Sequence, residues 1–445
     1  EIMPSLVGSE MCIRDRTRAD SGRVIRQFTE HNLVTDAIRR LLSPPAYAIF
    51  KQFSWSDFMR SSLPIYKNLC GGIMLLGNTL EEKADSILLP PDTIPVATAG
   101  DPYSGTLETR GTLNSNETYA MGNGYHFTWD FGTDKANGTI KSVALTSRMF
   151  GNSGFAAADS AGSMFMDPVT KNAGNMYIQI IRGAGQYLCT PEKCTHVYLR
   201  KTDSSNMVFT KIKSLDMTAV GVTDCVDFSV AAEPVKTIRI ELPIEVDPVI
   251  KVFVDSSDRK VYFFGKAVQE DNERLRLDYA TVDLDSFAVS AKRSWVMNSA
   301  KFTVCAAAIH GGRLYAASNK ALLAFSSAGN LSESWEGVSG SGMWFYTVNG
   351  VLRYYTTDRK THSLYNGKWY GIYGCGDIGL GFSADIKPPY FPAHIMNQYL
   401  SEIQGGVQDP YLIAAADYLA TVNNLSEPLV KTSEHTLKIT YDITN

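Results

Sequence analysis

The sequence lacks a long apolar run, an excess of one charge and a regular pattern of cysteines. Its most apolar stretch, LCGGIMLLG at residues 69–77, is far shorter than the roughly 18 to 20 apolar residues that span a bilayer, so we expect no membrane insertion. The 42 Lys and Arg nearly balance the 46 Asp and Glu, and the pI is near 6.0. This balance argues against a general surface for nucleic acid, which basic domains provide.

The seven cysteines do not suggest a disulfide framework. They are scattered through a long chain, which favours folding in a reducing compartment. Cys189 and Cys194, in CTPEKC, form the one close pair and would be half of a zinc site. No second Cys or His pair stands at ligand spacing, so we expect free thiols on a loop and no metal.

Motifs that would identify an enzyme are also missing. GCGDIG at Gly374–Gly379 matches GxGxxG, but the LGFSADIKPP that follows cannot form the helix whose N-terminus holds a pyrophosphate. The chain contains no GxxxxGKS/T, HExxH or GxSxG motif. We therefore expect no catalytic residues and no cofactor.

The first 16 residues, EIMPSLVGSEMCIRDR, resemble translated adaptor DNA. Leu6–Asp15 can be read as CTC GTG GGC TCG GAG ATG TGT ATA AGA GAC, the mosaic end of a transposase sequencing adaptor. We therefore expect residues 1–16 to take no part in the fold, because a translated adaptor has no evolved contacts. The natural chain is expected to enter at about Thr17, with its own start missing.

What remains is longer than the roughly 250 to 300 residues at which a single core stops growing, so we expect at least two packed units. Residues 17–150 read as an N-terminal α+β domain for attachment, and residues 151–174, which are small, Gly-rich and aperiodic, read as a linker. Helical spacing covers residues 24–42, with Asn32 or Thr35 as a cap, and CGGIMLLGN reads as a buried strand. Alternating aromatic residues and the turn KANGT predict a β-hairpin over residues 125–147.

Residues 175–385 predict a mainly β domain that resembles an irregular β-propeller. Short strands recur between turns in DRKVYFFGK, GGRLYAASNKALLAFSSAGNLSESW and NGVLRYYTTDRKTHSLYNGKWYG. Tyr262, Tyr315 and Tyr354 mark equivalent strands, and a spacing of roughly 40 to 50 residues is typical of propeller blades. An irregular β-sandwich of several sheets is the alternative fold, and the number of blades stays open.

Residues 386–445 read as C-terminal helices and a strand that pack back on the N-terminal domain. IMNQYLSEI and PYLIAAADYLATVNNL have helical spacing, whereas Leu437, Ile439, Tyr441 and Ile443 alternate as a closing strand. We expect that strand to pair in the same sheet as residues 125–147, because an exposed apolar edge would invite aggregation. The two ends of the chain would then form one sandwich-like domain with the blades inserted between them.

Carboxylates and aromatic residues of the central region are the candidates for sugar chemistry. Two carboxylates at a suitable separation would make a glycosidase, and the candidates are Asp224, Asp227, Asp255, Asp258, Asp283 and Asp285. Most of them lie at turns, where Asp is expected for local hydrogen bonds. The aromatic residues that would stack on sugars are Trp335, Trp344, Tyr355, Trp369, Tyr370 and Tyr373, although blade cores use aromatic side chains as well.

Three stretches make the chain similar to structural tail and tail-fibre proteins of tailed bacteriophages that infect Gram-positive gut bacteria. They are FTEHNLVTDAIRRLL, GYHFTWDFGTDKANGTIKSVALTS and YLATVNNLSEPLVKTSEHTLKITYDIT, which cover the two flanks and not the blades. The resemblance implies a non-enzymatic component of the virion tail that is made in the host cytoplasm. The partners that it implies are other tail proteins, further copies of the chain and a glycan or protein of the host surface. It defines no site residues. A propeller glycosidase acting on cell-surface polysaccharide and a bacterial carbohydrate-binding or scaffold protein remain the alternatives.

Overall fold

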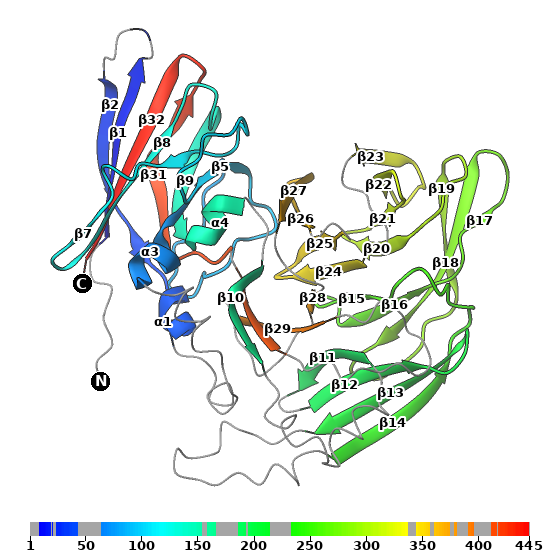
Figure 1. Ribbon diagram of the computed structural model, residues 1–445. Coiled ribbons are helices and arrows are strands. Elements are labelled where there is room, and N and C mark those ends of the chain that lie inside the picture. Colours follow the sequence, from blue (N-terminus) through cyan, green and yellow to red (C-terminus); the bar gives the residue numbers. More distant parts are fainter. Residues whose placement is uncertain are drawn as a thin grey trace.

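The computed structural model describes residues 9–18, 20, 24–42, 64–153, 158–165, 186–192, 195–213, 233–336, 344–356, 360–373, 378–380, 390–395, 411–415 and 417–444. Within them the chain is mainly β, with a few short helices. A two-sheet sandwich lies at one side, and a propeller-like series of antiparallel sheets lies at the other (Figure 1). No helix among the described residues is long and apolar enough to cross a bilayer.

The sandwich is built from both ends of the chain. Its first sheet has the order β2-β1-β32-β8-β6, with β7 also pairing with β8. These strands are β1 (Ser9–Arg18), β2 (Val24–His31), β6 (Thr112–Leu113), β7 (Tyr119–Met121), β8 (Gly124–Phe131) and β32 (His435–Thr444). The second sheet has the order β3-β31-β9-β4-β5. Its strands are β3 (Leu33–Val34), β4 (Gly72–Leu76), β5 (Pro95–Ala99), β9 (Gly138–Thr146) and β31 (Thr421–Lys431).

The expected pairing of the C-terminal strand is confirmed. In β32 every second residue is buried, including Leu437, Ile439 and Tyr441, and the strand runs antiparallel to β8 with Ile439 opposite Trp129. The expected hairpin over 125–147 is wrong, however. After the turn β9 enters the opposite sheet, where it pairs with β4 and β31, so β8 and β9 face each other across the core.

Residues 9–16 take part in the fold, contrary to the expectation for an adaptor-like segment. β1 lies between β2 and β32 and pairs with both, from Ser9 opposite Ile443 to Arg18 opposite His435. A strand in this position needs only backbone N–H and C=O groups to complete its ladders. That requirement is independent of how the segment arose.

The spacing of residues 24–42 predicts a helix, but only the last six residues form one, α1 (Ala37–Leu42). The earlier residues form β2 and β3 because β1 and β31 offer them strand partners, and such tertiary pairing overrides local propensity. The expected cap is partly right, since the Thr35 hydroxyl accepts a hydrogen bond from Ala37 N at 3.2 Å. Two other helices, α3 (Ile65–Cys70) and α4 (Arg148–Ser153), contact the sandwich near β4.

The propeller-like domain contains five antiparallel sheets within the described residues, which we call blades 1 to 5. Blade 1 has β11 (Gln186–Glu192), β12 (Thr195–Lys201), β13 (Asn206–Lys213) and β14 (Glu233–Glu241). Blade 2 has β15 (Phe253–Asp255), β16 (Lys260–Phe264), β17 (Val268–Gln269), β18 (Arg274–Asp283) and β19 (Arg293–Asn298). Blade 3 has β20 (Ala306–His310), β21 (Arg313–Ala317), β22 (Ala321–Phe325) and β23 (Leu331–Glu336), and blade 4 has β24 (Trp344–Val348), β25 (Val351–Tyr355), β26 (Lys360–Tyr365) and β27 (Lys368–Tyr373).

Blade 5 combines segments from before and after the other blades. Its order is β10-β30-β29-β28, in which β10 (Ala158–Phe165) precedes blade 1, while β28 (Ile378–Leu380), β29 (Tyr390–Ile395) and β30 (Tyr411–Ala415) follow blade 4. Two expectations are corrected here. The linker over 151–174 contains strand β10, and the helical spacing of 410–425 belongs to strands β30 and β31, while 396–410 lies outside the described residues.

Turn chemistry and shared apolar cores hold successive blades together. Gly311 and Gly312, and likewise Asn349 and Gly350, have positive φ, as two-residue hairpins require. Tyr262, Tyr315 and Tyr354 occupy the second strands of blades 2, 3 and 4, as the spacing predicts. One apolar cluster joins blades 1 and 2, and another joins blades 2, 3 and 4.

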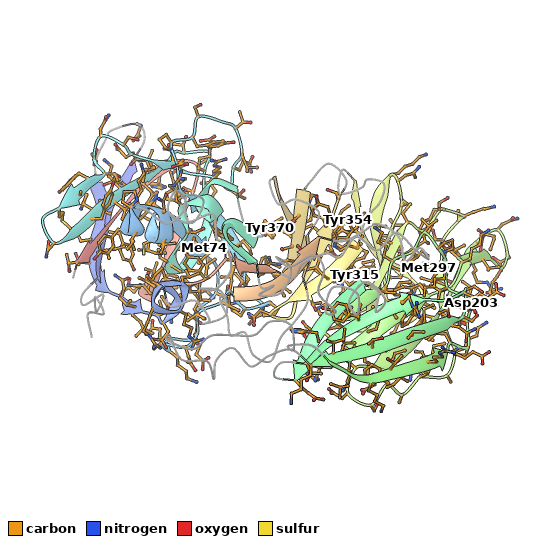
Figure 2. All side chains as sticks on the ribbon, turned by 60° about the horizontal axis from the view of Figure 1, so that its bottom comes forward. Met74, Asp203, Met297, Tyr315, Tyr354 and Tyr370 are labelled. Atoms are coloured by element: carbon orange, nitrogen blue, oxygen red, sulfur yellow. The ribbon has the colours of Figure 1, made fainter. Side chains whose placement is uncertain are left out.

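Strand β4 of the second sandwich sheet is buried on both faces. Ile73 and Leu75 point into the sandwich core, whereas Met74 and Leu76 join a cluster with residues of blade 4. This double burial explains the unbroken apolar sequence of β4, since alternation is needed only where one face meets water. Figure 2 labels Met74 on the sandwich side of this junction and Tyr370, which packs against the same cluster, on the blade side.

Candidate functional site

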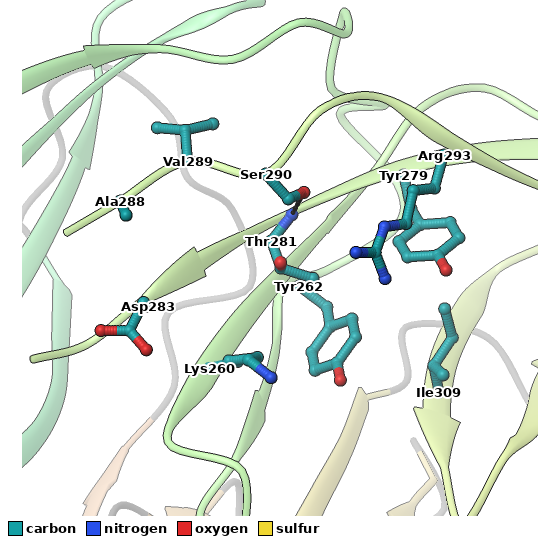
Figure 3. Close-up of a pocket in the computed structure, with 10 residues that line it drawn as sticks. All are labelled: Lys260, Tyr262, Tyr279, Thr281, Asp283, Ala288, Val289, Ser290, Arg293 and Ile309. Carbon is teal, nitrogen blue, oxygen red and sulfur yellow. Dashed lines mark hydrogen bonds between the residues drawn. The ribbon is translucent and has the colours of Figure 1, made fainter. Parts of the chain in front are cut away.

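A cavity of about 320 Å³ lies between blades 2 and 3 (Figure 3). Its walls come from β16, β18, β19, the segment that leads into β19, and β20. Ten residues line it: Lys260, Tyr262, Tyr279, Thr281, Asp283, Ala288, Val289, Ser290, Arg293 and Ile309. A pocket of this size is at the lower end of the range, roughly 300 to 1,000 Å³, that small ligands occupy.

Strand register brings these side chains to one face of blade 2. Lys260 stands opposite Asp283, Tyr262 stands opposite Thr281, and Tyr279 stands opposite Arg293. Because side chains alternate along a strand, these three cross-strand pairs share one face, while Val261, Phe263 and Val282 point to the core with blade 1. Figure 3 shows both tyrosine rings pointing the same way, toward the side where Ile309 of β20 lies.

Two cations of the pocket form no hydrogen bond or ion pair with another described residue. Lys260 is half-buried and Arg293 is exposed, and both side chains face the cavity. Other cations of the same blade do have carboxylate partners: Arg259 with Asp285, Arg274 with Asp271, and Arg276 and Lys292 with Asp278. The pocket lining therefore contains two cations and one carboxylate, Asp283, which stands opposite Lys260 and feels its charge.

The carboxylate of the pocket, Asp283, is held ionised. The backbone N–H and the hydroxyl of Ser286 donate to its Oδ1 at 2.8 and 2.7 Å, and together with the N–H of Asp285 they lower the pKa of Asp283. Tyr262 behaves in the opposite way, because burial and the nearby charges of Asp258 and Asp255 raise its pKa well above the usual range. Tyr262 therefore remains a protonated hydroxyl donor at neutral pH.

A three-blade clasp lies next to the pocket, formed by Asp255 of blade 2, His310 of blade 3 and Gly350 of blade 4. His310 Nδ1 is 3.1 Å from Asp255 Oδ2, and His310 Nε2 is 3.1 Å from the carbonyl oxygen of Gly350. The imidazole of His310 therefore bridges a carboxylate oxygen of blade 2 and a carbonyl oxygen of blade 4. Ser256 and Thr347 add a hydroxyl contact of 2.9 Å between blades 2 and 4.

The structure separates the six candidate carboxylates. Asp255 is buried in the clasp, Asp258 is exposed and accepts a hydrogen bond from Tyr262 OH at 3.4 Å, and Asp283 lines the pocket. Asp285 forms a two-pronged ion pair with Arg259, with Arg259 Nε 2.8 Å from Asp285 Oδ2. Asp224 and Asp227 lie outside the described residues.

The candidate aromatic residues lie mainly in cores. Trp344 and Tyr355 are fully buried at the junction, with ring centroids 4.7 Å apart. Trp335 and Trp369 meet edge to face at 5.9 Å and pack against the core of blades 2 to 4. Tyr370 packs at the junction, and the side chain of Tyr373 lies outside what is described. None of the described aromatics in this set lines the pocket.

The thiol and glycine motifs supply no metal or nucleotide site in the described part of the chain. Cys189 is buried in β11, where burial raises the pKa of its thiol well above the ordinary range, so it is a core residue and not the loop thiol that we expected. Cys194 and residues 374–377 lie outside the described ranges. Among the described residues no group of three or more His, Cys, Asp or Glu side chains is placed to hold a metal.

A Thr-His-Asp arrangement on the sandwich has the order of a hydrolase triad but not its accessibility. His126 Nδ1 contacts the Asp442 carboxylate, and His126 Nε2 is 3.3 Å from Thr128 Oγ1. Thr128 is completely buried, and its hydroxyl donates to the Glu117 carbonyl at 3.2 Å. A nucleophile must reach its substrate, so this group ties β7, β8 and β32 together instead.

Sequence reasoning missed most of the pocket. Lys260, Tyr279 and Arg293 were not among the candidates, and Tyr262 served only as a marker of the repeat. The available signal was the alternation in KVYFF and DYATVD, which places Lys260 with Tyr262 and Tyr279 with Asp283 on single faces. Ile309 arrives from another blade, and no local pattern indicates that approach.

The fold and the pocket define a class: a mainly β protein whose propeller-like domain, with a polar pocket between two blades, is inserted into a β-sandwich. The sequence matches no protein-family model and no curated protein. Among solved structures, the chain is similar to an α-L-arabinanase from Penicillium chrysogenum at 11% identity, covering 81% of this chain and 99% of that one with a TM-score of 0.28.

Two further structures have the same level of similarity. BamB from Moraxella catarrhalis is 10% identical over 75% of this chain and 99% of that chain, with a TM-score of 0.22. A gluconolactonase from Xanthomonas campestris is 10% identical over 52% of this chain and 85% of that chain, with a TM-score of 0.27.

Proposed function

We propose that this protein is a non-enzymatic tail component of a bacteriophage virion, in which the sandwich joins the virion and the propeller-like domain faces the host surface. The virion role rests on the resemblance of the two flanks to phage tail proteins. The observation that carries the binding role is the pocket between blades 2 and 3, which is lined by two cations, a carboxylate and several hydroxyl groups.

The connection between the two domains supports a role in attachment. Both flanks of the sequence contribute to the sandwich, so the propeller-like domain is an insertion held at both ends. A shared apolar cluster and the buried group Arg353, Tyr365 and Asp417 fix the junction. A rigid junction presents the binding face in a constant direction relative to the attachment domain, which multivalent contact requires.

The chemistry of the pocket supports binding without turnover. Glycoside hydrolysis uses a carboxylic acid whose pKa is raised so that it can donate a proton, next to an ionised carboxylate. The pKa of Asp283 and of Asp255 is instead lowered. Both side chains are therefore ionised at neutral pH and are suited to hydrogen bonding or ion pairing.

The virion role is tested by immunogold electron microscopy of phage particles enriched from gut samples that contain this gene, with antibodies against the purified chain. Labelling at the tail is the expected result. Labelling absent from all particles, although the antibodies recognise the denatured chain in the same fraction, would contradict the virion role.

The binding role is tested separately, with fluorescent full-length chain on a panel of Gram-positive gut isolates. Biotinylated chain tetramerised on streptavidin is expected to bind at least one isolate about 100-fold more tightly than the monomer, because linked sites gain avidity. Reducing ends released from extracted surface polysaccharide are measured in parallel. If reducing ends are released and Asp283→Asn abolishes that release, the protein is a glycosidase. If neither the monomer nor the tetramer binds any isolate, host recognition is overturned.

A further inference from the structure

We infer that the pocket between blades 2 and 3 binds a polyhydroxylated anion, that is, a sugar or polyol unit bearing a carboxylate or a phosphate. This inference rests on the proposed host-surface binding and names the class of ligand that the site takes. It follows from the charge, the hydroxyl groups and the size of the pocket, each of which excludes a different kind of ligand.

Charge selects an anion. Lys260 and Arg293 stand on either side of Tyr262 and Tyr279 on the same face of blade 2. Neither forms a direct ion pair with a described residue, although the charge of Lys260 acts on Asp283, which stands opposite it. Asp283 is the single carboxylate that lines the cavity, so the lining bears two positive charges against one negative charge. An Arg guanidinium binds a carboxylate or phosphate through parallel hydrogen bonds. This geometry favours these anions over halide ions and over neutral ligands.

The remaining lining selects a ligand with hydroxyl groups. Asp283 stays ionised and offers oxygen acceptors, while the hydroxyls of Tyr262, Tyr279 and Thr281 are donors as well as acceptors. A purely apolar ligand would cover the hydroxyls of Tyr279 and Thr281 without offering them a hydrogen bond, which is unfavourable. A simple inorganic anion would occupy only part of the cavity of about 320 Å³, which is also lined by Val289 and Ile309.

The site is preorganised. The clasp joins the ends of β15 and β20, at Asp255 and His310, to Gly350 in the turn after β24. Ile309 of the pocket directly precedes His310. Tyr262 and Tyr279 are nearly buried and belong to the core shared by blades 2 to 4. Little conformational entropy is therefore lost when a ligand enters, since these side chains are already ordered.

The test uses the full-length chain and three probes: trigalacturonate, poly(glycerol phosphate) and the neutral trisaccharide maltotriose. Isothermal titration calorimetry measures each affinity at about 50 mM and about 500 mM NaCl, because attraction between exposed charges is screened by salt. We expect both anionic probes to bind more tightly than maltotriose, and their binding to weaken as the salt concentration rises. The tighter of the two anionic probes identifies the anion as carboxylate or phosphate.

Three variants locate the site. Arg293→Gln and Lys260→Met are each expected to weaken the anionic probes about tenfold or more, with no effect on maltotriose. Lys266→Met is the matched control, because Lys266 is exposed, belongs to the same blade and does not line the pocket. We expect that control to change the affinity less than about twofold. The melting temperature of each variant confirms that the fold is intact.

Three results would overturn the inference. Equal affinity for maltotriose and the anionic probes would show that charge does not select the ligand. Equal loss in Lys266→Met and Arg293→Gln, or failure of folded wild-type chain to bind either anionic probe, would show that the pocket is not the site. If the wild-type chain binds neither anionic probe but still binds cells, host attachment uses another surface. If it does not bind cells either, the proposed host recognition is contradicted as well.

Discussion

At the scale of single residues, the clasp of Asp255 explains how a buried carboxylate can remain charged. Burial by itself raises the pKa of Asp255, but the hydrogen bond and charge of His310, with the N–H groups of Ser257 and Asp258, outweigh burial and hold the pKa below the ordinary value. A group with a lowered pKa in the folded state stabilises the fold above its unfolded pKa, about 3.9 for Asp. That stability is lost as the pH falls through the folded pKa.

Asp255→Asn is therefore expected to lower the free energy of unfolding at pH 7 by about 1.5 to 3 kcal/mol, the usual size of hydrogen bonds to charged groups. The difference from wild type should shrink below about pH 4, where the wild-type carboxyl also becomes protonated. Urea unfolding between pH 3 and 7 measures both values, with Asp92→Asn at an exposed turn as the control. A difference that is constant across this range would show that Asp255 does not contribute as a charged group.

At the scale of elements, the strand pairing of β1 shows its place in the fold, which its amino-acid sequence does not. The segment reads as translated adaptor DNA, yet residues 9–18 occupy a central position between β2 and β32. Without β1 both neighbours would have unpaired N–H and C=O groups along one edge. The fold therefore predicts a stabilising role for residues 9–16, although they resemble a translated adaptor.

Deletion of residues 1–16 is expected to lower the melting temperature by at least about 3 °C, since a loss of about 1 kcal/mol shifts the midpoint by roughly 2 to 4 °C in a domain of 150 to 250 residues. Deletion of residues 1–8 leaves all of β1 in place and is the matched control. Differential scanning calorimetry of the three chains makes the comparison. An unchanged melting temperature after the longer deletion would mean that the segment is an appendage, as its resemblance to a translated adaptor predicts.

At the scale of the whole molecule, the junction couples the sandwich to blade 4. Asp417 lies just before β31, and its Oδ2 accepts from Arg353 Nη2 and Tyr365 OH, each at 2.6 Å. All three side chains are buried, and burial beside Asp417 raises the pKa of Tyr365 well above its ordinary range, which keeps its hydroxyl a donor. The Asn349 side chain adds a hydrogen bond to the Leu89 carbonyl across the same junction, at 3.3 Å.

Asp417→Asn is expected to destabilise the protein by about 3 to 5 kcal/mol, because it removes the buried carboxylate charge that faces the Arg353 guanidinium. Limited proteolysis with mass spectrometry should show new cleavage in blade 4 and in the sandwich together, since both contribute to the junction cluster. Asp203→Asn in blade 1, far from the junction in Figure 2, is the control and should leave the digestion pattern unchanged. New cleavage confined to one of the two domains would contradict the coupling.

Local sequence determined the strands that have one buried face. The alternation of β8 and β32 was readable because one side of each strand meets the core and the other meets water, and the turns at Gly311–Gly312 and Asn349–Gly350 were readable because positive φ favours Gly and Asn. These features depend only on neighbours in the chain. They were enough to predict a mainly β fold, repeated blades and a C-terminal strand that returns to the sandwich.

Tertiary structure decided what neighbours in the chain cannot specify. The turn after β8 leads β9 into the opposite sheet, and β10 pairs in blade 5 with strands that follow it by more than 200 residues. Residues 411–415 and 421–425 have helical spacing but form strands, because they pair with other strands of the fold. The pocket belongs to the same category. Lys260, Tyr279 and Arg293 are ordinary strand residues in sequence, and they form a site because register and the approach of Ile309 from the next blade bring them around one cavity.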